Sequence, residues 1–151
     1  MRGWLLDTNV LSELARPRPE PRVIDWLSSL PADRSFVSVL TLAEIDQGIE
    51  ALPANDGRQE RYQRFRSHVE AQFTGRILSL DDETVRAWGA LSGQYRRTFG
   101  GKAPVIDALL AATAQRRRLH VATRNVSDMR RLGGSAFDPW VDDPTQYPLQ
   151  L

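Results

Sequence analysis

The sequence alternates short, largely apolar runs with longer stretches whose apolar residues recur at helical spacing. The runs span residues 3–6, 36–39, 77–80 and 119–122, and a last extended piece lies around Phe137. Helical spacing covers residues 10–15, 23–30, 41–52, 58–73, 82–99 and 105–118, and a short helix begins near Ser127. Apolar runs of this kind are typical of strands buried on both faces. The pattern predicts an α/β fold with a short central parallel sheet flanked by helices on both faces.

The chain of 151 residues has the length of one domain with its own core, and it contains no repeat and no inner linker. We therefore expect a single domain over residues 1–151, with the Pro- and Asp-rich residues 138–151 forming a tail that wraps the surface. No apolar run approaches the ~20 residues of a membrane span, and no secretory leader is visible. There is no cysteine, which excludes disulfides and thiolate sites. We expect a cytoplasmic protein that does not enter a membrane.

The formal net charge of +1 does not by itself indicate a nucleic-acid binder, but the arginines are unevenly distributed. Lys102 is the only lysine, and arginine suits phosphate better than lysine does. Two clusters of arginines allow two interpretations, a solvated helix face or a phosphate-binding surface. The clusters are Arg58, Arg61, Arg64 and Arg66 in one segment and Arg116, Arg117 and Arg118 in another.

Polar residues follow the predicted strands at the points where the strands end. In open α/β sheets, sites form at the carboxyl ends of the strands, so these residues are expected to share one edge. They are Asp7, Thr8 and Asn9 after the first strand, Ser38, Thr41 and Glu44 after the second, and Thr123, Arg124, Asn125 and Asp128 after the fourth. Asp107 joins them from the first turn of the helix that follows Pro104.

Each of these residues also has an ordinary structural explanation. Asn9 can cap the helix over 10–15, and Asp7 can form an Asx turn. Residues 41–44 read TLAE, which matches a capping box, and an acid at Asp107 favours the helix dipole. Asn125 or Ser127 can cap the short helix that follows. Taken one at a time, the residues do not establish a site.

Taken together, four carboxylates are expected near one edge of a small sheet: Asp7, Glu44, Asp107 and Asp128. Converging like charges repel unless a cation joins them. Mg²⁺ and Mn²⁺ prefer oxygen ligands, and such ions promote hydrolysis of phosphodiesters. The set therefore indicates nuclease-like chemistry.

Competing motifs fail on inspection. There is no G-x-G-x-x-G, and the GGKA at residues 100–103 lacks the spacing and the Ser/Thr of a P-loop. An aspartyl-phosphatase motif usually has a second aspartate where Asn9 stands. His68 and His120 lie in a polar helix and a predicted strand, where structural or exposed roles are expected.

Four motifs in order resemble those of the PIN domain, and specifically the VapC toxins of bacterial toxin–antitoxin pairs. They read LLDTNVLSE at residues 5–13, LAEIDQG at 42–48, PVIDALLAATA at 104–114 and VATRNVSD at 121–128. GRIL at 75–78 and FDPW at 137–140 resemble the FitB-type branch. The resemblance covers nearly the whole chain.

The resemblance implies a PIN fold and the toxin component of a type II toxin–antitoxin system, acting as a Mg²⁺- or Mn²⁺-dependent endoribonuclease. It implies an RNA substrate, a cognate VapB- or FitA-like antitoxin, a homodimer, and contact with DNA only through the antitoxin. The implied catalytic and metal-binding residues are Asp7, Glu44, Asp107 and Asp128, supported by Thr8, Asn9, Thr123 and Asn125. Asn125 and Asp128 remain alternatives for the fourth active-site position.

Other readings stay open. The chain can instead be a PIN-fold partner that holds a DNA-binding antitoxin and catalyses little, or a metal-dependent phosphatase or DNA nuclease. Leu11, Leu14, Ile24 and Leu27 can offer the antitoxin an apolar groove, or they can be ordinary core. The class of RNA is not specified by the sequence.

Overall fold

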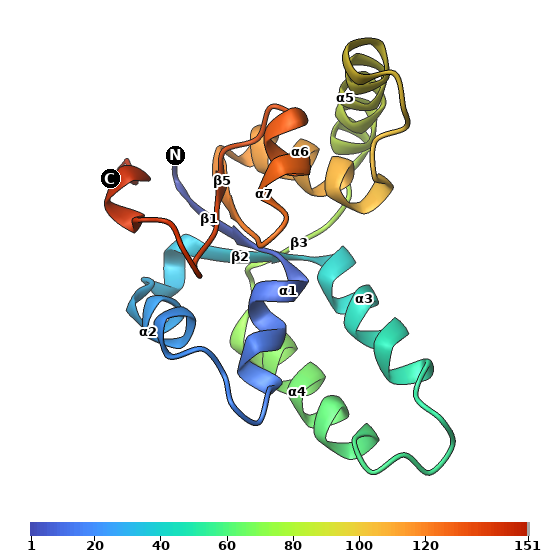
Figure 1. The fold of residues 1–151 in the computed structure, drawn as a ribbon, viewed down its shortest axis with the longest axis vertical. Helices are drawn as coiled ribbons and strands as arrows, with labels where there is room; N and C mark the ends of the chain where they lie inside the picture. Colours follow the sequence, from blue (N-terminus) through green and yellow to red (C-terminus); the bar gives the residue numbers. More distant parts are fainter. Residues whose placement is uncertain (151) are drawn as a thin grey trace.

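The computed structural model describes residues 1–150 and has a five-stranded, fully parallel sheet at its centre (Figure 1). The strands lie in the order β3-β2-β1-β4-β5. Their bounds are β1 Gly3–Leu6, β2 Ser35–Ser38, β3 Ile77–Leu78, β4 Leu119–Ala122 and β5 Ala136–Phe137. The two central strands pair along their whole length, with Leu6 opposite Ala122 at their carboxyl ends.

Helices cover both faces of this sheet, as the sequence predicts (Figure 1). One face carries α1 Thr8–Leu11, η1 Ser12–Ala15, α2 Pro21–Ser29, α3 Val39–Glu50 and α4 Gln59–Gln72. The other carries α5 Asp82–Phe99, α6 Val105–Arg117 and α7 Val126–Arg131. Two short 3₁₀ turns complete the described chain, η2 Ala32–Arg34 and η3 Pro144–Gln146. The predicted α/β architecture is confirmed.

The sheet separates two apolar cores because successive strand residues point to opposite faces. Leu6 and Ala122 pack with the helices α1, α2 and α4, whereas Leu5 and Val121 pack with α5, α6 and α7. Both faces of the sheet are therefore covered by helices and shielded from solvent, which explains why the strands are nearly continuous apolar runs in the sequence.

Several predicted boundaries are wrong, and one error bears on function. Asp7, and not Asn9, is the N-cap of α1. The capping box over residues 41–44 is also wrong, because α3 already begins at Val39 and the Ser38 hydroxyl caps it. Glu44 is thereby left free to bind a residue from another element. The predicted strands 36–39 and 77–80 shift or shorten to β2 and β3, because the following helix and loop take over their last residues.

The order of the strands creates a crevice between β1 and β4. The chain leaves β1 into α1 on one face and leaves β4 into α7 on the other, so the two connections diverge. Ligands of open α/β sheets bind at such a point, outside the carboxyl ends of the strands. Asp7 and Thr123 are the first residues after these two strands.

A close approach of two backbone segments requires a glycine at position 3 in β1. A Cβ atom at this position would lie 2.3 Å from the carbonyl oxygen of Arg34. We expect Gly3→Ala to lower the free energy of unfolding by about 2 kcal/mol, because β1 and the segment before β2 must move apart. Urea unfolding measures this. Gly48→Ala is the matched control, because a Cβ there meets nothing within 4 Å; an equal loss in both variants would contradict the explanation.

The tail from residue 138 to 150 runs back along the molecule. Tyr147 and Leu149 pack against the core on the α1 side, and the Gln150 N–H donates to the Met1 carbonyl at 2.7 Å. Leu151, the last residue of the expected tail, lies outside the described residues. No helix within residues 1–150 is long and apolar enough to cross a membrane.

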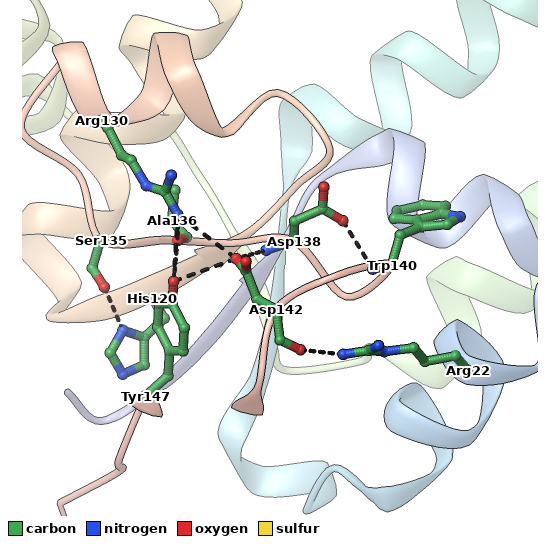
Figure 2. Close-up of polar contacts among 9 residues, drawn as sticks. All are labelled: Arg22, His120, Arg130, Ser135, Ala136, Asp138, Trp140, Asp142 and Tyr147. Carbon is green, nitrogen blue, oxygen red and sulfur yellow. Dashed lines mark hydrogen bonds and ion pairs between the residues drawn. The ribbon is translucent and has the colours of Figure 1, made fainter. Parts of the chain in front are cut away.

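The two histidines lie outside the crevice. His120 is buried in β4, with one ring nitrogen 2.7 Å from the Ser135 hydroxyl (Figure 2). Its other ring nitrogen lies 3.2 Å from the Pro148 carbonyl oxygen. Burial lowers the pKa of His120, so the ring favours its neutral form. His68 is exposed on α4. Neither residue contributes a side chain to the acidic pocket described below.

Candidate active site

Asp7 lies at the base of the crevice with only 6% of its surface exposed. Its carboxylate accepts hydrogen bonds from the Thr8 N–H at 2.7 Å, the Thr123 hydroxyl at 2.8 Å and the Asn9 amide at 3.2 Å. Burial nevertheless raises the pKa of Asp7, against the opposing effect of these three donors. The side chain is thus held rigidly in a position that disfavours its charge.

Asn9 and Thr123 join the two central strands around Asp7. The Asn9 amide oxygen accepts from the Arg124 N–H at 3.1 Å, and the Thr123 hydroxyl oxygen accepts from the Asn125 N–H at 3.0 Å. Both side chains also donate to Asp7, so each one ties the loop after β4 to the loop after β1. The predicted supporting residues are therefore placed to orient the aspartate.

Glu44 reaches the same site from α3. Its carboxylate accepts a hydrogen bond from the Thr8 hydroxyl at 2.6 Å, across 36 residues of sequence. Thr8 stands next to Asp7 in the chain, so this contact fixes the second acid beside the first. One Glu44 oxygen is used in the contact, and the other is available to a ligand.

Asp107 comes from the first turn of α6 and is the most perturbed acid of the group. The Asn125 amide donates to its carboxylate at 2.7 Å. Its pKa is raised to about 6, first by desolvation and then by the charges of Asp7, Asp128 and Glu44. Such a shift, produced by converging like charges in a hollow, is characteristic of functional sites.

Asn125 and Asp128 occupy different positions at this site. Asn125 lines the acidic pocket and touches Asp107 directly. Asp128 lies half-buried in the first turn of α7, outside the pocket wall, and acts on Asp107 through its charge. The three acids Asp7, Glu44 and Asp107 thus meet at one pocket, with Asp128 behind it.

The acidic pocket has a volume of about 480 Å³ and opens to solvent. Its walls include Asp7, Thr8, Asn9, Ser12, Glu44, Asp107 and Asn125. Of the ion pairs formed within residues 1–150, none involves Asp7, Glu44, Asp107 or Asp128. The pocket is therefore a concentration of uncompensated negative charge.

This donor set suits a hard divalent cation. It offers carboxylate oxygens, together with hydroxyl and amide oxygens, and no soft ligand. Within the described residues, no group of three or more Asp, Glu or His side chains is gathered tightly enough to hold an ion. Mg²⁺ does not require such a closed group of ligands, because it usually binds through one or two carboxylates and keeps several waters.

A second hollow, a groove of about 520 Å³, adjoins the acidic pocket and shares Thr8, Asn9, Ser12 and Glu44 with it. Its other walls include Ile45, Ile49, Phe65, Arg61, Arg124 and Trp140. The sequence alone does not predict a role for Arg124 or Trp140. Their positions in the TRN and FDPW motifs were the available signal, but only the tertiary structure brings the two side chains together.

Most of the clustered arginines are engaged elsewhere. Arg58, Arg64 and Arg66 pair with Asp56, Glu60 and the acids Asp46 and Glu70, respectively. In the second cluster, Arg116 and Arg117 contact acids at the start of α5 and its cap. For these residues the solvated-face reading fits the structure. Arg61 is the member of the first cluster that lines the groove.

The apolar residues expected to form the groove are only partly available. Leu11 is 1% exposed and belongs to the core, which is the second of the two alternatives that the sequence left open. Leu14 is 43% exposed, and Leu27 packs partly against the core. The apolar wall of the groove instead comes from Ile45 and Ile49 of α3 and Phe65 of α4, because these helices run side by side below the sheet (Figure 1).

Comparison with known proteins agrees with this geometry. Residues 4–134 match the PIN domain family. The chain is 37% identical over 138 residues to Toxin FitB of Neisseria gonorrhoeae, covering 91% of this chain and 99% of that protein. It is 32% identical over 136 residues to VapC ribonuclease Y4jK of Sinorhizobium fredii, covering 90% and 96%, respectively.

A solved structure of FitAB bound to an IR36 DNA fragment contains a similar chain. The two chains superpose with a TM-score of 0.83 at 31% identity, over 93% of this chain and 97% of the other. The shared fold and the extent of the sequence match exceed what a common α/β architecture alone would give. The chain therefore belongs to the PIN-domain family, among its VapC- and FitB-type members.

Proposed function

We propose that the protein is the toxin of a type II toxin–antitoxin pair and that it hydrolyses RNA phosphodiester bonds with Mg²⁺ or Mn²⁺ as cofactor. The observation that carries the proposal is the convergence of Asp7, Glu44 and Asp107 on one pocket, where none of them forms an ion pair with a cation of residues 1–150. The VapC-type relative described above is named a ribonuclease, which supports RNA as the substrate. Because that substrate is cellular RNA, we place its action in the cytoplasm.

The roles of the side chains follow from their contacts. Asp7 and Asp107 would hold the cation, and Glu44 would bind it directly or through water. Thr123 and Asn9 orient Asp7, Thr8 orients Glu44, and Asn125 orients Asp107. Asp128 would serve a second, weaker cation position or orient water. When bound, the cation supplies Lewis-acid stabilisation of the phosphate charge and lowers the pKa of water.

Removal of the divalent ion tests the proposal. We expect the purified protein to cut a labelled pool of cellular RNA with Mg²⁺ or Mn²⁺, and the rate to fall at least about a hundredfold in EDTA. Restoring an excess of Mg²⁺ should restore the rate. Cutting that persists in EDTA would refute the metal requirement. Failure to cut any RNA, by folded protein with the ion present, would favour a protein that mainly holds its antitoxin.

A cognate antitoxin belongs to the same proposal. The FitAB assembly contains a similar chain and is bound to DNA, which supports a partner that carries the DNA contact. The groove beside the acidic pocket offers that partner apolar walls and an acidic end at Glu44. We expect the product of the neighbouring gene to form a stable complex and to suppress cleavage. Light scattering of the free protein would measure the proposed homodimer.

A further inference from the structure

Arg124 stands at the junction of the acidic pocket and the groove. It follows Thr123 and precedes Asn125, which donate to Asp7 and Asp107, respectively. Its own N–H donates to the Asn9 amide oxygen at 3.1 Å. The backbone of Arg124 is thus fixed by the same hydrogen bonds that position the acids, although its side chain touches neither of them.

The guanidinium of Arg124 is exposed and forms no ion pair with any residue in the 1–150 range. Instead its central carbon lies 4.2 Å from the centroid of the Trp140 ring. Stacking on an aromatic face restrains the planar guanidinium but leaves its N–H groups free in the plane. An arginine held in this way is prepared to bind an oxyanion that arrives from solvent.

The turn that carries Trp140 is itself rigid. The Trp140 N–H donates to an Asp138 carboxylate oxygen at 2.8 Å, and the Asp138 N–H donates to Asp142 at 2.8 Å (Figure 2). Arg22 of α2 donates to the Asp142 carbonyl, and Arg130 of α7 lies 3.7 Å from the Asp142 carboxylate. Helices from both faces of the sheet therefore fasten this turn, and Trp140 packs partly against the core.

From this arrangement we propose that Arg124, supported by Trp140, binds a backbone phosphate of the RNA strand next to the phosphate that is cut. This inference rests on the proposed ribonuclease function, and it identifies the residue that positions the RNA strand. The four acids repel RNA, so a cation from the protein is needed where the strand leaves the pocket. Arg124 lines the groove at that exit, and no carboxylate among residues 1–150 forms an ion pair with it.

Binding of RNA without cleavage tests this directly. A fluorescein-labelled single-stranded RNA of about twelve nucleotides is titrated with protein in EDTA, and anisotropy gives Kd over a range of salt concentrations. We expect Arg124→Ala to raise Kd about tenfold and to reduce the slope of log Kd against log salt by about 0.7, the value for one lost phosphate contact on a single strand. Arg124→Lys should recover the slope and part of the affinity.

Arg131→Ala is the matched control. Arg131 is also exposed and also lies over an aromatic ring, that of Phe99 at 5.3 Å, but it lines a separate hollow. We expect its Kd to change less than about twofold, because only the overall charge is altered. Trp140→Leu should raise Kd about threefold with an unchanged slope, because the charge remains but its support is lost. Thermal unfolding of each variant verifies folding.

The outcomes separate this inference from the proposed function. With Mg²⁺ present, Arg124→Ala should raise KM for RNA cleavage while kcat stays within about twofold, because the residue positions the strand and does not take part in the reaction. If the wild-type protein cuts no RNA but the anisotropy pattern holds, the Arg124 contact stands and the nuclease proposal fails. If the protein cuts RNA and Arg124→Ala binds like wild type, or Arg131→Ala is equally impaired, the inference is overturned.

Discussion

Asp7→Asn is expected to lower the rate of RNA cleavage about a hundredfold or more while the protein stays folded. The substitution keeps the size of the side chain and the hydrogen-bond acceptor for the Thr8 N–H. It removes the charge that would attract the cation and halves the oxygen donors at the base of the pocket. Single-turnover rates on a labelled RNA, with Mg²⁺ in excess, measure the loss.

The stability of Asp7→Asn is expected to change much less than its activity. Burial raises the pKa of Asp7, so its charge at neutral pH costs folding free energy that an amide does not. In Asp7→Asn, however, an amide nitrogen replaces the oxygen that accepts from Thr123 and Asn9, and the lost contacts offset this gain. The melting temperature of the variant in EDTA should therefore stay close to that of the wild type. Asp56→Asn is the matched control, because Asp56 is an aspartate whose side chain is only 16% exposed and which lines neither the acidic pocket nor the groove. An inactive Asp56→Asn, or an Asp7→Asn variant of unchanged rate, would remove the metal-ligand role from Asp7.

Asp107→Asn is expected to abolish a pH dependence of stability as well as most of the activity. Desolvation and the neighbouring acids raise the pKa of Asp107 from 3.8 to about 6, so the folded protein binds this proton more tightly than the unfolded chain does. The stability contributed by the protonated group is fully present below pH 3.8 and is lost as the pH rises through about 6. At pH 7 the charged Asp107 carboxylate therefore destabilises the ion-free protein.

The size of this stability change is limited because Asp107 is only partly buried. After solvent screening, we expect Asp107→Asn to be more stable than the wild type by about 1 kcal/mol at neutral pH and equal to it below about pH 4. Urea unfolding in EDTA at the two pH values measures this difference. Excess Mg²⁺ should stabilise the wild type at neutral pH and have less effect on the variant, because the cation binds the charged carboxylate.

A similar acid supplies the control. Asp82 lies in the first turn of α5, as Asp107 lies in the first turn of α6, but it is exposed and pairs with Arg86. Asp82→Asn removes the same charge from the first turn of a helix, two positions nearer the helix start than Asp107. Its stability should show neither the gain at neutral pH nor the response to Mg²⁺. If Asp82→Asn and Asp107→Asn behave alike, the helix dipole and not the acidic pocket governs the effect.

The sequence by itself determined the elements and the composition of the site. The run that ends at Asp7 and the run that precedes Thr123 were identified as strands because apolar periodicity reports burial. Placing polar residues at the carboxyl ends of parallel strands then brought Asp7, Glu44 and Asp107 to one edge, and the structure indeed gathers them there. Local periodicity suffices to locate the strands, and the general rule for parallel sheets then places the residues after them at one edge.

Tertiary structure alone decided which side chains meet. The pairing of β1 with β4 brings Thr123 to Asp7, across 116 residues. Thr41 and Glu44 matched a capping box, but Ser38 caps α3, and Glu44 instead binds the Thr8 hydroxyl. Arg124 and Trp140 stack because a rigid turn returns the chain to the crevice. Such contacts depend on strand order and on competition among hydrogen-bond partners. Neither of these can be inferred from the periodicity of apolar residues in the sequence.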